Sequence, residues 1–139
     1  MVLPQNPSQL TPSDLKAMAR VRMKDAELLL RGRRFDGAAY LCGYALEMTL
    51  KARICKTLQW THFKVNGNDY KFLKTHDLDF LLDFSGRSRT IRGRANFANW
   101  SMVNAWKPEF IRYQPVKNHV QEADARNMIA AAKKLMRLL

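Results

Sequence analysis

The segment from residue 36 to about residue 58 constrains the fold most, because apolar side chains cover most of the helix that it predicts. They form two neighbouring rows: Leu41, Ala45, Met48, Ala52 and Cys55, and then Leu46, Leu50, Ile54 and Leu58. Both rows have the period of an α-helix. A helix with so much apolar surface must be surrounded by other elements. We therefore expect this helix, capped by Asp36, to be the central element of the domain.

The polar side of this helix is a narrow strip made of Tyr40, Tyr44, Glu47 and Lys51. Residues at these spacings lie on one line along a helix, and on a central helix such a line borders a cleft or an interface. Glu47 and Lys51 either contact phosphate and orient an arginine, or form an intrahelical ion pair of about 0.2 to 0.5 kcal/mol. Tyr40 and Tyr44 either stack on a base, or pack in the core or at a dimer contact.

The rest of the chain predicts further helices. One runs from a cap at Thr11 to about Arg31, and a short one follows a cap at Thr75 and ends at Gly86. Another covers 94–105, and the last runs over 119–138 behind a cap at Asn118. The segments 60–74, 85–93 and 107–117 are expected to be irregular. Since no segment alternates with period two, the expected fold is all-α, an antiparallel helical bundle of four longer helices and one short helix.

Length and composition favour a single domain over 11–139, preceded by a mobile leader over 1–10. The chain has 139 residues, of which 47% are hydrophobic, enough for one core. Its apolar runs are far shorter than the roughly 20 residues of a membrane span. The start of the chain also lacks the pattern of a secretory signal. We therefore expect a cytoplasmic protein with no membrane partner.

The two cysteines are expected to be reduced core residues. Cys42 and Cys55 lie on one predicted helix, roughly 20 Å apart at about 1.5 Å per residue, which is too far for a disulfide. Neither has a histidine or another cysteine at the spacing that zinc sites use. No metal and no cofactor is expected.

The charge of the chain indicates an anionic partner. The formal net charge is +12, and the basic residues are spread over 20–34, 51–56, 87–94 and 133–137. Nucleic acid or nucleotide is the interpretation that we favour. An acidic protein partner and a merely soluble basic surface are the alternatives.

Two motifs together carry a resemblance to a known family. The first is Ala45-Leu46-Glu47 followed by Leu50-Lys51-Ala52, and the second is Thr75-His76-Asp77-Leu78. With these motifs in this order, the chain resembles the HEPN family, a nucleotide-binding domain named for its occurrence in higher eukaryotes and prokaryotes. The resemblance extends from about Leu15 to the last helix. It implies a helical bundle that often forms homodimers and that binds nucleotide or RNA.

The resemblance also implies two classes of function. Many members are metal-independent endoribonucleases, frequently of toxin or defence type, whereas others are non-catalytic nucleotide-binding modules or partners of a small nucleotidyltransferase. The ribonuclease members carry an arginine followed about four to six residues later by a histidine. Arg112 and His119 match this pattern with six residues between them. The commonest form has a shorter spacing and a polar residue directly after the arginine, where this chain has Tyr113.

Arg112 and His119 have side chains suited to cleaving RNA without a metal. The reaction needs groups that take and return a proton, and cations for the charge on phosphorus. His119 is expected in the first turn of the last helix, where the helix dipole disfavours positive charge. Arg112 offers a planar fork for phosphate oxygens. In the alternative, Arg112 pairs with Glu109 or another carboxylate, and His119 has no catalytic role.

The remaining candidates are binding residues. Tyr113, Tyr44, Glu47 and Lys51 are the expected contacts to RNA or nucleotide. We interpret His76 as structural: Thr75 caps the short helix, Asp77 interacts with the helix dipole, and His76 bonds to nearby backbone.

Overall fold

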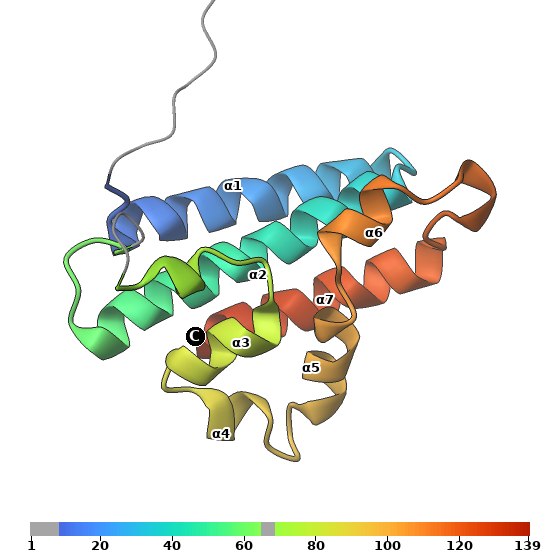
Figure 1. Ribbon diagram of the computed structural model, residues 1–139. Coiled ribbons are helices and arrows are strands. Elements are labelled where there is room, and N and C mark those ends of the chain that lie inside the picture. The colour runs from blue at the N-terminus through green and yellow to red at the C-terminus, as the bar shows by residue number, and fades with distance from the viewer. Residues whose placement is uncertain (1–8, 65–68) are drawn as a thin grey trace, which may run out of the picture.

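The computed structural model describes residues 9–64 and 69–139, and these residues form an all-helical bundle without strands (Figure 1). Its three long helices are α1 (Pro12–Arg31), α2 (Phe35–Leu58) and α7 (Glu122–Leu138). Four shorter helices lie between α2 and α7: α3 (Leu78–Phe84), α4 (Ser88–Ile91), α5 (Phe97–Asn104) and α6 (Pro108–Arg112). Single 3-10 turns occur at Lys71–Leu73 and Val116–Asn118. The expected all-α bundle is confirmed.

Helix α1 begins where the sequence predicts. The Thr11 hydroxyl accepts a hydrogen bond from the Asp14 backbone at 3.1 Å, and the Asp14 carboxylate accepts one from the Thr11 backbone at 3.0 Å. This reciprocal capping box satisfies two backbone donors that a helix start leaves unpaired. Of the expected leader over 1–10, residues 1–8 lie outside the described part of the chain. Leu10 accepts a backbone hydrogen bond from Phe63 and packs against the core.

Helix α2 is the central element, as its apolar rows predict. It lies between α1 and α7, with α3 and α5 also on the α7 side (Figure 1). Its side chains Cys42, Leu46, Leu50 and Ile54 have no exposed surface. Burying side chains of this size contributes about 1.5 to 3 kcal/mol each, so α2 supplies much of the driving force for folding.

The three long helices do not all alternate in direction. A short turn joins α1 to α2, so these two helices are antiparallel (Figure 1). At the start of α2 the Asp36 carboxylate accepts a hydrogen bond from the Val120 backbone at 2.5 Å, and at its end Arg53 donates to the Leu139 carbonyl at 3.4 Å. Helix α7 therefore runs parallel to α2, and the short helices carry the chain back along α2.

A glycine on α2 lets the returning chain come close to it. A Cβ atom at Gly43 would lie 2.0 Å from Cε2 of Trp106, which is a buried residue in the connection after α5. No side chain can occupy that space without moving the indole. Gly43 thus allows the α5–α6 connection to pack directly on α2, next to the polar strip.

The start of α7 differs from the expectation. The helix begins at Glu122 with Gln121 at the cap position, so Asn118 is not the cap and His119 is not in a first turn. The later start follows from a contact with a residue far away in the sequence. The Val120 backbone donates to Asp36, and residues 119 and 121 have extended backbone. Asp36 consequently binds this segment and does not cap α2, whose cap position is Arg34.

The short elements also depart from the expected boundaries. Helix α5 begins at Phe97 where a start at 94 was expected, and the segments expected to be irregular contain α4 and α6. Pro108 at the first position starts α6. Arg92, directly after α4, pairs with Asp79 and Asp83 of α3, each at 2.8 Å, and so holds α4 against α3. Within 9–64 and 69–139, every helix is too short or too polar to span a membrane.

Candidate functional site

The polar strip of α2 begins with two tyrosines that belong to an aromatic cluster. The rings of Tyr40 and Tyr44 pack edge to face with centroids 5.1 Å apart, and their hydroxyl oxygens are 3.5 Å apart. Tyr44 also packs edge-on against Trp106 at 4.9 Å and against His76 at 5.5 Å. Burial first, and then the hydrogen bond with Tyr40, raise the pKa of Tyr44 above its ordinary value. Its phenol therefore remains protonated near neutral pH and can donate a hydrogen bond.

Further along the strip lies a carboxylate with no exposed surface. Oε1 of Glu47 is 3.0 Å from Nζ of Lys51 and 2.9 Å from Nδ1 of His76. The Lys51 side chain is 12% exposed and its ammonium also lies 5.5 Å from the Phe63 ring centre. Of the two sequence interpretations of Glu47 and Lys51, these contacts are those of the ion pair. Among the described residues, the other carboxylate oxygen of Glu47 has no hydrogen-bond partner.

His76 is positioned by Glu47. The sequence interpretation, in which His76 bonds to nearby backbone, is wrong. The Thr75 hydroxyl accepts from the Asp77 backbone, and Asp77 in turn caps α3 by accepting from the Phe80 backbone at 3.1 Å. The cap of α3 is thus Asp77 and not Thr75. This leaves the imidazole free to reach α2. The two sequence motifs that carry the family resemblance meet in the contact between His76 and Glu47, which sequence reasoning missed.

The exposed side of His76 borders a pocket between α3 and α6. The pocket has a volume of about 360 Å³, and its lining includes His76, Asp77, Lys107, Glu109 and Phe110. The side chain of His76 is 56% exposed. We call this space the α3–α6 pocket.

Arg112 is the last residue of α6 and its side chain is exposed. Its guanidinium lies 5.7 Å from the ring centre of Tyr113, which is 80% exposed. Arg112 is also close enough to Tyr44 for its charge to oppose, to a smaller extent, the rise in the pKa of that phenol. In the described residues Arg112 forms no ion pair with Glu109 or with any other carboxylate, so its guanidinium is available to an external anion.

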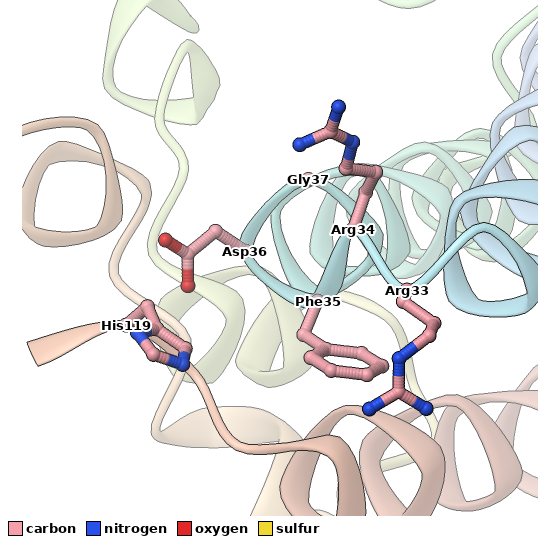
Figure 2. A pocket seen from close by; sticks show the side chains of 6 residues that line it. All are labelled: Arg33, Arg34, Phe35, Asp36, Gly37 and His119. Atoms are coloured by element: carbon pink, nitrogen blue, oxygen red, sulfur yellow. The ribbon is translucent and has the colours of Figure 1, made fainter. Parts of the chain in front are cut away.

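His119 lies at a second pocket, formed at the turn between α1 and α2 (Figure 2). The pocket has a volume of about 420 Å³ and is lined by Arg33, Arg34, Phe35, Asp36, Gly37 and His119. In Figure 2, His119 and Asp36 lie at one end and Arg33 at the other. We call this space the His119 pocket.

The ring of His119 is held by one hydrogen bond. Its Nδ1 lies 2.6 Å from the Val116 carbonyl oxygen, and because a carbonyl only accepts, Nδ1 must carry the hydrogen. In the neutral ring, Nε2 is then the unprotonated nitrogen and can accept a proton. Arg33 of the same pocket lies 3.6 Å from Glu122 and 5.5 Å from the Phe35 ring centre. No ion pair involves the Arg34 side chain in the part of the chain that the structure describes.

Arg112 and His119 lie toward the same side of α2 but at separate places in one chain. Arg112 is near Tyr44, whereas His119 is near Asp36, and these two positions on α2 are about 12 Å apart at 1.5 Å per residue. Arg112 does not line the His119 pocket.

An apolar groove is lined by a sequence neighbour of each residue. Its volume is about 370 Å³, and residues of α2, α5, α6 and α7 contribute to its lining. The lining includes Met102, Trp106, Ile111, Val120 and Met128, with Asp124 as its one carboxylate among the described residues. Ile111 directly precedes Arg112, and Val120 directly follows His119. Met102 is 42% exposed at this groove.

A basic pocket lies across α2 from the polar strip. Its volume is about 460 Å³, and its cationic side chains are Lys16 and Arg20 of α1 with Arg53 and Lys56 of α2. Among the described residues, no carboxylate side chain lines it. The four cations add to the positive field around the domain.

The described residues thus form an all-helical bundle with a polar strip along its central helix, one histidine against the middle of that strip and another near the start of the helix. The family model of the HEPN domain matches residues 12–139. The chain belongs to the HEPN domain family, which is associated with nucleotide or RNA binding and with ribonuclease activity. No curated protein and no solved structure matches the chain.

Proposed function

We propose that this HEPN domain binds single-stranded RNA and cleaves it without a metal ion, as toxin or defence ribonucleases do. His119 transfers the proton and Arg112 binds the phosphate. The hydrogen bond between Nδ1 of His119 and the Val116 carbonyl carries the proposal, because it presents Nε2 as a proton acceptor in an open pocket.

In the proposed reaction, Nε2 of His119 takes the proton from a ribose 2′-hydroxyl. The 2′-oxygen then attacks the adjacent phosphorus, and the bond from phosphorus to the 5′-oxygen breaks. A protonated His119 from a second copy of the chain gives its proton to that leaving oxygen. The products are a 2′,3′-cyclic phosphate and a free 5′-hydroxyl, and no co-reactant is consumed.

The cations near the site suit the charge of the substrate. The guanidinium of Arg112 can hold two phosphate oxygens and stabilise the charge that builds up on them. Arg33 and Arg34 add positive charge at the His119 pocket. Tyr113 and Tyr44 have aromatic surface for an adjacent base, while Glu47 and Lys51 contribute by orienting residues around the strip.

A homodimer is part of the proposal because one chain does not bring Arg112 to the His119 pocket. A second copy that covers the apolar groove would approach Ile111 and Val120, the neighbours of the two site residues. A two-fold dimer uses the same patch on both copies, so both Arg112 and His119 pairs would border one cleft.

The test is cleavage of end-labelled single-stranded RNA in EDTA by the wild type, Arg112→Ala and His119→Ala. We expect the wild type to leave a cyclic phosphate, and each variant to lose at least about a hundredfold in rate. Lys24→Ala, at an exposed position on α1, is the matched control and should cut at the wild-type rate. Cleavage by His119→Ala at the wild-type rate would contradict the proposal.

The second candidate is a non-catalytic nucleotide-binding module or a partner of a small nucleotidyltransferase. The separation of Arg112 from the His119 pocket within one chain favours it. Saturable binding of RNA or nucleotide by all three proteins, with no cleavage, would support this candidate over the ribonuclease.

A further inference from the structure

We propose that the α3–α6 pocket binds a guanine base of the RNA. The inference rests on the proposed function, since it names the base that the same domain would select. Its basis is the mixture of side chains in the pocket together with the way in which His76 is held.

The charges around the pocket suit a neutral polar ligand better than a phosphate. Lys107 contributes a cation, but Asp77 and Glu109 contribute carboxylates to the same lining. A phosphate would meet both carboxylates and be repelled by them. A nucleobase is uncharged and carries hydrogen-bond donors and acceptors side by side, so a pocket with both signs of charge can satisfy it.

Guanine has the pattern that these side chains complement. Its N1–H and one hydrogen of its 2-amino group point the same way and match the two oxygens of one carboxylate, which only accepts. Glu109 is exposed and forms no ion pair within the described residues, so it can take this role. The O6 and N7 atoms of guanine are acceptors and match the ammonium of Lys107. Among the standard bases, only guanine has two adjacent donors beside acceptors in this arrangement.

An aromatic side chain at the pocket can hold the face of the base. Phe110 lines the pocket and its side chain is 63% exposed. Proteins that read single-stranded RNA stack bases on such rings and hydrogen-bond their edges. Phe110 and Arg112 both belong to α6, so the pocket and the proposed phosphate contact share one short helix.

His76 is held as a recognition group would be. Glu47 fixes Nδ1 at 2.9 Å and Tyr44 packs edge-on against the ring at 5.5 Å. Because the carboxylate only accepts, Nδ1 carries the hydrogen, and Nε2 of the neutral ring accepts. The second hydrogen of the guanine 2-amino group is a suitable donor for Nε2. The contact with the buried Glu47 fixes the orientation of the ring and so the direction in which Nε2 points.

The direct test compares the binding of GMP, AMP, CMP and UMP to the full chain in EDTA, by calorimetry or by amide chemical shifts. We expect GMP to bind at least about tenfold more tightly than the other three, a difference typical of one bidentate contact. Inosine monophosphate, which lacks the 2-amino group, should bind more weakly than GMP. Equal affinities for the four nucleotides would overturn the proposal.

Variants assign the selectivity to the pocket. Glu109→Gln should remove most of the preference for GMP over inosine monophosphate, and Phe110→Ala should weaken all purine nucleotides. The controls are Asp25→Asn, a half-exposed carboxylate on α1 that pairs with Arg22, and Phe97→Ala, whose ring is 60% exposed and lies outside the pocket. Both controls should bind GMP as the wild type does. Unchanged selectivity in Glu109→Gln would overturn the assignment.

The two proposals fail in different ways. Selective GMP binding without RNA cleavage keeps the guanine pocket and removes the ribonuclease. Cleavage that shows no preference for guanine in oligonucleotides differing at one base keeps the ribonuclease and removes the guanine pocket.

Discussion

Nδ1 of His76 and Oε1 of Glu47 are 2.9 Å apart, although the two residues are separated by 29 positions in the sequence. The same carboxylate oxygen lies 3.0 Å from the ammonium of Lys51. Glu47 therefore joins α2 to the segment before α3 and neutralises a mostly buried cation at the same time. Its removal should affect both stability and the position of His76.

Replacing Glu47 by Gln should lower the free energy of unfolding by about 3 kcal/mol. The change leaves the ammonium of Lys51, which is 12% exposed, without its counter-charge. Urea denaturation at pH 7 measures the loss. The control Glu122→Gln, whose solvent-accessible carboxylate pairs with Arg126 and Arg33, should lose no more than about 1 kcal/mol. Equal stability of the two variants would show that the buried pair contributes little.

Replacing Gly43 by Ala should destabilise the domain by about 1 to 3 kcal/mol, because the new methyl group would overlap the indole of Trp106. The matched control is Gly32→Ala at the end of α1. A Cβ there would lie 3.5 Å from the nearest atom, the Leu28 carbonyl oxygen, and φ is −81°, so the control should change stability little. Thermal unfolding followed by tryptophan fluorescence reports both stability and the indole environment. A Gly43→Ala protein as stable as the control would mean that Trp106 moves away at no cost.

The two cysteines should react slowly with iodoacetamide at pH 8 while the protein is folded. Burial raises the pKa of Cys42 to about 12 and that of Cys55 to about 11, so both are neutral thiols below pH 10 and the reactive thiolate is scarce. Unfolding in urea should restore the ordinary rate for both residues. Mass spectrometry of digested protein separates the two sites, and rapid labelling of either in the native state would contradict their burial.

Placing a charge in the apolar groove should separate the proposed dimer. Met102→Asp puts a carboxylate at a partly exposed position that a second copy would cover, and a desolvated unpaired charge disfavours association. Light scattering after gel filtration should show a monomer, and cleavage should fall with it. Leu28→Asp changes a residue that is 61% exposed on α1, away from the groove, and should leave the mass unchanged. A wild type that is monomeric at working concentration would remove the dimer from the proposal.

Local patterns predicted the parts of the fold that depend on local interactions. The capping box at Thr11 involves residues three positions apart, and the apolar rows of α2 reflect the helical period, so both are readable from the sequence. The start of α7 was not readable, since Asp36 holds the Val120 backbone from 84 positions away and delays the helix.

The same distinction between local and long-range interactions applies to the candidate site. The sequence singled out the polar strip of α2 and the pair Arg112 and His119, because each has a recognisable spacing. The link from Glu47 to His76 depends on how α3 packs on α2, and no short-range pattern encodes that packing. For the same reason, the separation between Arg112 and the His119 pocket became visible only in three dimensions.

Because α7 runs parallel to α2, the chain between them has to travel back along the whole central helix. Ser85 meets Thr57 near the end of α2, Trp106 meets Gly43, and Val120 meets Asp36 at its start. This return path carries His76, Arg112 and His119, whereas the three long helices supply most of the buried core residues. Changes at the exposed positions of the return path can therefore alter which ligand the domain accepts while the buried residues keep the framework stable.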